Sequence, residues 1–114
     1  MNTFFCSTER PIKFVGVFNE DVTAYCLYGS RGSVFLTIPW ASITQAATQS
    51  QKGGATDYYL KFGTYCRSFT TLMFMPSAVK VGILQSTFSR LHHMVDWAAT
   101  VPKILSQSYK KKPV

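Results

Sequence analysis

The first two thirds of the chain consist of short runs rich in β-branched and aromatic residues, and such runs predict β-strands. Residues 12–18 and 22–28 are two of these runs, and the polar turn between them indicates a hairpin. A turn with two glycines then leads into residues 34–38. Pro39 ends this third run, because proline cannot donate a hydrogen bond to a strand ladder.

A polar segment separates these strands from a second predicted hairpin. Residues 48–56 hold no apolar side chain larger than alanine and contain two adjacent glycines, which indicates a flexible loop. Residues 58–62 and 65–75 are again rich in aromatic and β-branched residues, and they predict two strands with a turn at residues 63–64. Pro76 ends the second of these strands.

The last third of the chain carries an amphipathic helical pattern. Six apolar residues recur at alternating spacings of three and four, which places them on one stripe of a helix. They are Val81, Leu84, Phe88, Leu91, Val95 and Ala98. The four that we expect to be buried are Leu84, Phe88, Leu91 and Val95. The helix begins either near Ser77 or, if residues 79–84 form a further strand, at Ser86.

These elements predict an α+β fold, in which an antiparallel sheet of about five or six strands is followed by one C-terminal amphipathic helix. A chain of 114 residues has room for one domain, which we assign to residues 1–105. The basic residues 106–114 are predicted to form a flexible tail. One short helix cannot cover both faces of such a sheet, so we expect a homo-oligomer, most simply a two-fold dimer.

The charge of the chain favours an anionic partner. Lys and Arg number twelve against five acidic residues, which gives a formal net charge of +7. A charge of this size on a small domain favours nucleic acid, anionic lipid or an acidic protein, although basic charge also serves solubility. Hydrophobic residues make up 46% of the chain, and this excludes disorder as its overall state.

The cysteines and the apolar runs indicate in which cellular compartment the protein is expected. No apolar run approaches the ~18 residues that a membrane span requires, and the N-terminus lacks the pattern of a secretory signal. Cys6, Cys26 and Cys66 are widely spaced and form no C-x-x-C pair, so we expect no zinc site. Free thiols predict an intracellular location, cytoplasmic or nuclear. Cys26 and Cys66 lie in apolar runs and are expected in the core.

The sequence contains no pattern typical of a catalytic site. It has no phosphate-binding loop, no G-x-G-x-x-G and no G-x-S-x-G motif. His92 and His93 are adjacent, so on the predicted helix their imidazoles point about 100° apart and cannot share a metal ion. We interpret them as residues of the helix surface, with Asp96 spaced to pair with His92. The prediction is a protein that is not an enzyme and holds no metal or cofactor.

The second predicted hairpin offers a binding surface. Tyr59 and Lys61 lie two positions apart, so in a strand they share one side. Tyr65, Arg67 and Phe69 share one side of the next strand in the same way. Aromatic rings that alternate with cations suit single-stranded nucleic acid, because bases stack on rings and cations hold phosphates. The predicted nucleic-acid-binding residues are Lys13, Arg31, Lys52, Tyr59, Lys61, Tyr65, Arg67 and Phe69.

Residues 82–91 resemble the end of the single-stranded DNA-binding fold of the positive cofactor 4 coactivators and the plant Whirly proteins. The resemblance lies in Gly82-Ile83-Leu84, a glycine-led apolar strand end, followed by the segment STFSRL, which begins a helix with a large aromatic residue. The spacing before the aromatic residue departs from the coactivator pattern. The resemblance implies a dimer joined through helices, with nucleic acid lying along the sheets.

The sequence therefore favours a non-enzymatic protein that binds single-stranded DNA or RNA with a basic, aromatic sheet face. The first alternative is a protein-interaction or oligomerisation module that exposes the same aromatic face. A second is a pleckstrin-homology-like binder of lipid or peptide, which also has strands followed by a C-terminal amphipathic helix. Arg31 and Lys52 lie in predicted turns, which favours a lipid binder. Lys61 and Arg67 lie in predicted strands beside aromatic residues, which favours nucleic acid.

Overall fold

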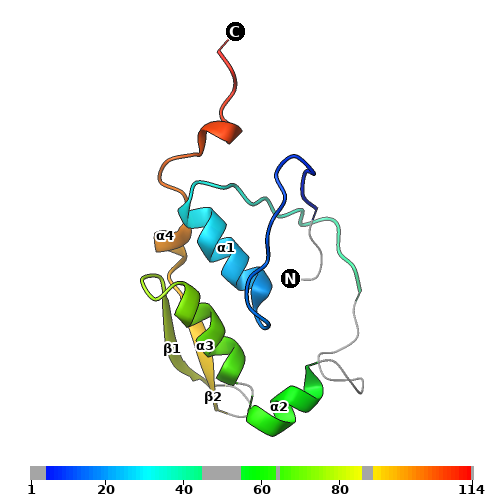
Figure 1. Cartoon of the computed structure of the whole chain (residues 1–114), viewed down its shortest axis with the longest axis vertical. Coiled ribbons are helices and arrows are strands. Elements are labelled where there is room, and N and C mark those ends of the chain that lie inside the picture. Colours follow the sequence, from blue (N-terminus) through cyan, green and yellow to red (C-terminus); the bar gives the residue numbers. More distant parts are fainter. Residues whose placement is uncertain (1–4, 45–54, 64, 86–88, 114) are drawn as a thin grey trace.

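The computed structural model describes residues 5–44, 55–63, 65–85 and 89–113. Within these ranges the chain forms four α-helices, one 3-10 helix and a two-stranded sheet (Figure 1). In chain order the elements are α1 (Glu20–Ser30), α2 (Thr56–Phe62), α3 (Tyr65–Phe74), β1 (Val79–Leu84), β2 (Arg90–Val95), α4 (Trp97–Thr100) and η1 (Gln107–Tyr109). No described helix is long and apolar enough to cross a bilayer.

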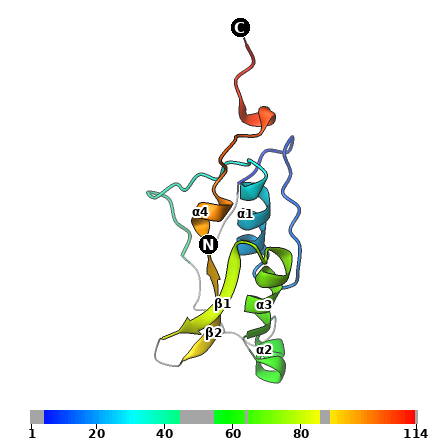
Figure 2. The same cartoon turned by 90° about the vertical axis from the view of Figure 1, so that its left-hand side faces the viewer.

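The predicted sheet of five or six strands and the predicted single C-terminal helix are both wrong. The fold is α+β, but three of its α-helices precede a hairpin of only two strands, and α3 packs beside that hairpin (Figure 2). Residues 12–18 and 34–38 lie outside helices and strands, and residues 22–28 belong to α1. A short apolar run fits a partly buried helix as well as a strand, so its composition alone did not decide between them.

The helix α1 shows why the strand prediction for residues 22–28 failed. The small residues Thr23, Cys26 and Gly29 recur every three positions and are buried, a helical spacing that their aromatic and β-branched neighbours concealed. Gly29 is required for a close approach between two elements. A Cβ atom at this position would lie 2.6 Å from the carbonyl oxygen of Thr100, so glycine lets α4 come this near to α1.

The helices α2 and α3 replace the two strands predicted over residues 58–62 and 65–75. The predicted break between these segments is confirmed at Gly63, which follows α2 with a φ of 85°, a backbone conformation that favours glycine. Aromatic side chains four positions apart contact one another in both helices. A helix brings such residues together on one face, and these contacts favour the helical form.

The fully buried core of the described chain is made of small side chains. Its apolar members are Ala24, Cys26, Ala78 and Val79, and Thr23, Ser68, Thr71 and Thr100 are buried with them. The helices α1 and α3 meet at Thr23 and Thr71, whose hydroxyl oxygens lie 3.3 Å apart. The expected burial of Cys26 is confirmed, whereas Cys66 is only half-buried. Short side chains at this contact let the two helices lie close together.

The strands β1 and β2 pair in antiparallel register, with Val79 opposite Val95 and Val81 opposite His93. The alternative that residues 79–84 form a strand is confirmed, and the helix predicted to follow it is wrong. In β1 the apolar residues recur two apart, which is the period of a strand, whereas in β2 they do not. The predicted helical stripe joined residues from both strands, so its spacing identified neither of them.

The stripe that was predicted to be buried on one helix lies instead on two strands. Leu84 and Val95 are half-buried, and Leu91 is 43% exposed. Phe88 lies outside the described residues. In this last third of the chain an α-helix begins after β2. The carboxylate of Asp96 accepts a hydrogen bond from the backbone N–H of Ala99 at the N-terminus of α4.

The N-terminal segment reaches the C-terminal one. The guanidinium of Arg10 donates to the carbonyl oxygen of Ser108 and lies 4.7 Å from the ring centroid of Tyr109. Figure 1 shows the C-terminal segment leaving the helices and extending from the upper end of the molecule. The helix α2 lies at the opposite, lower end, so the two ends of the molecule present different residues.

Candidate nucleic-acid interface

The binding residues predicted around the second hairpin lie on helices. Tyr59 and Lys61 belong to α2, and Tyr65, Arg67 and Phe69 belong to α3. Residues two apart on a helix point about 200° away from each other, so neither set shares one side. The predicted sheet face made of these residues is wrong, but some of them meet across the junction of the two helices.

Arg67 and Tyr59 are two predicted residues that the fold brings together. The guanidinium carbon of Arg67 lies 5.9 Å from the centroid of the Tyr59 ring, within the distance of a cation–π contact. Burial lowers the pKa of His92, and the nearby positive charges of Arg67 and Arg90 lower it further. These four residues, Tyr59, Arg67, Arg90 and His92, are named the Arg67 cluster below.

Further aromatic rings border the Arg67 cluster. The ring centroid of Phe18 lies 4.8 Å from that of Tyr58 and 5.2 Å from that of Tyr59. Tyr58 also contacts Phe62 at 4.6 Å. Tyr58 is 43% exposed and Phe62 is 47% exposed, so both rings are accessible to a ligand. The ammonium of Lys61 lies 5.3 Å from the Phe62 ring centroid, which adds a cation beside these rings.

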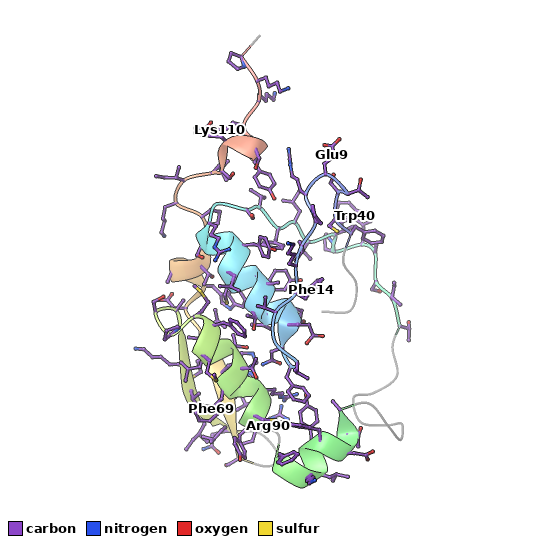
Figure 3. All side chains as sticks on the ribbon, in the orientation of Figure 1. Glu9, Phe14, Trp40, Phe69, Arg90 and Lys110 are labelled. Carbon is purple, nitrogen blue, oxygen red and sulfur yellow. The ribbon has the colours of Figure 1, made fainter. Side chains whose placement is uncertain are left out.

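The elements that carry these residues gather in the lower half of the molecule. α2, the first turns of α3 and the start of β2 lie there (Figures 1 and 2). Figure 3 shows Arg90 in this half and Lys110 near the opposite end. The elements α2, α3 and β2 together carry three basic residues and one acidic residue, and Asp21 of α1 adds a negative charge near His93. This part of the molecule therefore has a small excess of positive charge.

His92 and His93 form a contacting pair of imidazoles, with ring centroids 4.2 Å apart. The side-chain nitrogen of Asn19 donates to the backbone carbonyl of Arg67 at 2.9 Å and lies 3.1 Å from Nδ1 of His93. Because an amide nitrogen only donates, this contact is a hydrogen bond in the tautomer of His93 that carries its proton on Nε2 and accepts at Nδ1. Asn19 thus joins the start of α1 to α3 and to β2.

The surroundings of both imidazoles favour the neutral form. Burial lowers the pKa of His93, and the neighbouring His92 and Arg67 lower it further, while Asp21 acts in the opposite direction. Nδ1 of His92 is buried without a hydrogen-bond partner among the described residues. The interpretation of the two histidines as a helix-surface pair is wrong, because both lie on β2.

Lys13 and Arg31, two of the predicted binding residues, do not join the Arg67 cluster. Lys13 lies in the N-terminal segment, where its backbone N–H donates to the Tyr28 hydroxyl at 2.8 Å. Arg31 follows α1 and, with Lys103, lines an open cleft beside the C-terminal segment. Lys52 lies outside the described residues. The basic track that was predicted to extend through Lys13 and Arg31 to the other binding residues is not seen in the described chain.

Tyr65 and Phe69 form a separate aromatic pair on α3. Their ring centroids lie 6.1 Å apart, and the two side chains are 50% and 41% exposed. They are four residues apart and share one side of the helix. Arg67, between them in sequence, points to another side, towards Tyr59. Their part in a binding surface is therefore distinct from that of the Arg67 cluster.

The sequence prediction missed Phe18, Asn19 and Arg90 as site residues. No spacing along the chain relates them to Arg67, because they come together only when α1 and α3 pack on each other and α3 packs on β2. Asn19 alone carries a local signal. It adopts a left-handed conformation with a φ of 52°, which asparagine tolerates better than most residues, directly before a helix with two carboxylates in its first turn.

Neither the metal-ligand chemistry nor the comparisons assign a function to this surface. No group of three or more His, Cys, Asp or Glu side chains among the described residues could hold a metal ion. Comparison of the chain with protein-family models, curated proteins and solved structures finds no match. The resemblance of residues 82–91 to single-stranded DNA-binding proteins stays a prediction, and Arg90 and Leu91 lie in a strand rather than in the helix expected there.

Proposed function

We propose that this protein binds single-stranded nucleic acid at the Arg67 cluster and the neighbouring rings of α2, and that it acts by binding rather than by catalysis. The observation that carries the proposal is the contact between the Arg67 guanidinium and the Tyr59 ring, in a cluster that also holds Arg90. Single-strand binding requires cations for the phosphates and accessible rings for the bases. Both are found here, on the consecutive helices α2 and α3 and on β2.

The residues divide into two roles. Lys61, Arg67 and Arg90 supply positive charge and would contact phosphates, whatever the sequence of the bound strand. Tyr58 and Phe62 are the accessible rings beside them and would stack with unpaired bases. Stacking of this kind needs bases that are not already stacked in a duplex. A single strand, of DNA or RNA, is therefore the preferred ligand.

The charge contribution is tested by fluorescence anisotropy with labelled single strands of DNA and RNA, a duplex of the same length and anionic vesicles, at two salt concentrations. Arg67→Gln and Arg90→Gln should each weaken single-strand binding about equally for every sequence. Each should also reduce the slope of log affinity against log salt by about 0.7, because one phosphate contact is lost. Arg31→Gln is the matched control, since Arg31 lies away from the cluster, and it should leave both quantities unchanged.

The stacking contribution is tested on α2. Tyr58→Ala should lower the affinity for single strands roughly 5- to 150-fold, which corresponds to about 1–3 kcal/mol per stacked base, and should leave the salt slope nearly unchanged. Leu60→Ala removes an exposed apolar side chain from the same helix and should change neither quantity. Stronger binding to vesicles than to single strands, or no single-strand binding at all, would contradict the proposal.

A further inference from the structure

The single chain exposes far more surface than a compact protein of its mass. Its accessible surface is 9076 Å², whereas a folded monomer of 12.8 kDa exposes about 6,300 Å². Its radius of gyration is 16.3 Å, against roughly 13 Å for a compact chain of this length. The difference in area, about 2,800 Å², exceeds the roughly 1,000–2,500 Å² that one partner contributes to a large obligate interface.

Residues 33–40 contribute to this excess with a row of apolar side chains. The row consists of Val34, Leu36, Ile38 and Trp40, which are 37%, 88%, 49% and 87% exposed. Phe35 lies between them in sequence and anchors the segment, because its ring contacts Tyr25 of α1 at 4.8 Å. In Figure 1 the segment follows an open path away from the end of α1. Side chains that alternate in this way suit a strand with one covered face.

The backbone of this segment is free to pair. Residues 34–38 form no hydrogen bond with another backbone group of the described chain. They contain no proline, so every N–H in this stretch can donate, and Pro39 limits the length that can pair.

The hairpin of β1 and β2 has open edges that fit such a segment. Within the described chain each strand pairs only with the other, and a sheet of two strands is marginally stable on its own. Ile83 and Leu91 lie opposite each other in the hairpin and are 65% and 43% exposed. An open edge beside exposed apolar side chains is a template for a further strand.

We propose that residues 33–40 of one copy dock as an added strand on an edge of the β1–β2 hairpin of a second copy. The edge would supply the backbone hydrogen bonds that residues 34–38 do not form within the described chain, and alternate side chains of the segment would cover Ile83 and Leu91. Each copy carries both the segment and an edge, so two copies can exchange segments, and such a reciprocal exchange closes with two-fold symmetry as a dimer. The proposal does not depend on nucleic-acid binding.

The occupant is a second copy because the two incomplete features lie in the same chain and the excess area is large enough to supply what one partner buries in an obligate dimer. The charge of the chain gives a separate signature. Two copies of net charge +7 repel each other, so salt should strengthen an association through apolar side chains. Binding of nucleic acid should respond to salt in the opposite sense. The failure of one proposal is thus distinguishable from the failure of the other.

Sedimentation velocity of the full chain, from about 1 to 100 μM, tests the association; it requires a reducing agent because Cys6 is exposed. A dimer of twice 12.8 kDa is expected, with a larger dimer fraction at higher salt. Hydrogen exchange provides the second measurement. The amides of residues 34–38 should exchange more slowly as the protein concentration rises.

A pair of matched variants locates the interface. Leu36→Lys should weaken the dimer at least about tenfold, because one apolar side chain is lost from the contact. Leu60→Lys makes the same change at a position that is 81% exposed, against 88% for Leu36, and should leave the dimer intact. A monomer at every concentration, a dimer whose 34–38 amides are not protected, or equal effects of the two variants would each overturn the proposal.

Discussion

The contact between α1 and α3 and the segment at residues 33–40 use opposite kinds of side chain. The fully buried residues of these two helices are as small as Ala24, Thr23 and Ser68. In the segment, residues as large as Leu36 and Trp40 remain exposed. Close approach of backbones holds the first region together, and that approach depends on short side chains. Large apolar side chains are thus exposed on the surface of the single chain rather than buried in its core. Such exposed apolar residues indicate surfaces that bind other molecules.

The largest effect is expected from placing a large side chain at a fully buried position of α1. Ala24→Leu adds three carbon atoms at a position with no exposed surface, and we expect a loss of about 3 kcal/mol in the free energy of unfolding. Leu36→Ala removes three carbon atoms from the exposed segment and should change this free energy by less than about 0.5 kcal/mol in the monomer. Urea denaturation at low protein concentration measures both. Similar losses for the two variants would remove the distinction between the regions.

A smaller effect is expected from a single added carbon at the contact between α1 and α4. Gly29→Ala would gain about 1 kcal/mol in helix propensity, but its Cβ would lie 2.6 Å from the backbone carbonyl oxygen of Thr100. Backbone must then move, so we expect a net loss of about 1–2 kcal/mol in the free energy of unfolding. Ser30→Ala, at the exposed neighbouring position, is the control for urea denaturation. A stabilised Gly29→Ala variant would show that the two elements are not held this close.

The smallest effect on stability is expected from a change in pH, which acts through the two histidines of β2. The pKa values of His92 and His93 are lowered in the folded protein, so near pH 6 the unfolded chain binds more protons than the folded one. Their contribution to stability is complete above the unfolded pKa of about 6.5 and is lost as the pH falls below it. The thermal midpoint should drop by a few degrees between about pH 7 and pH 5.

Removal of the imidazoles provides the control for this pH dependence. A variant with both His92→Gln and His93→Gln should have a flatter profile over the same interval, because glutamine does not titrate. Thermal unfolding followed by circular dichroism measures both proteins in the same buffers. Identical profiles would show that these two groups do not cause the loss of stability.

The sequence predicted where secondary-structure elements end better than it predicted whether each element is a helix or a strand. Gly63 ends a helix where a turn was expected, and the strand at residues 79–84 was one of two open alternatives. Glycine gives such a local signal because it permits a positive φ. The type of element depended on which face is buried, and the buried face of α1 consists of small residues that add little to a hydrophobic pattern.

The candidate site was predictable only in part. Tyr59 and Arg67 were chosen because ring and cation alternate along a strand, but they meet because two helices join at a bend. Arg90 and Asn19 reach this place through tertiary packing between segments about 70 residues apart, which no local pattern encodes. Residue types that suit a ligand could be recognised from the sequence, whereas their assembly into one cluster required the fold.

The amide of Asn19 has a consequence for chemical ageing of the protein. Its nitrogen directs one hydrogen at the Arg67 carbonyl and the other at Nδ1 of His93, so both contacts need a donor at this atom. Deamidation to aspartate exchanges that nitrogen for oxygen with almost no change in shape. The Arg67 carbonyl oxygen would then face a carboxylate oxygen, and this contact between α1 and α3 would become repulsive. The contact with His93 would persist only if the imidazole carried a proton on Nδ1 and donated it to the carboxylate. A change of one atom, with almost no change in side-chain volume, would thus weaken one of the links between α1 and α3.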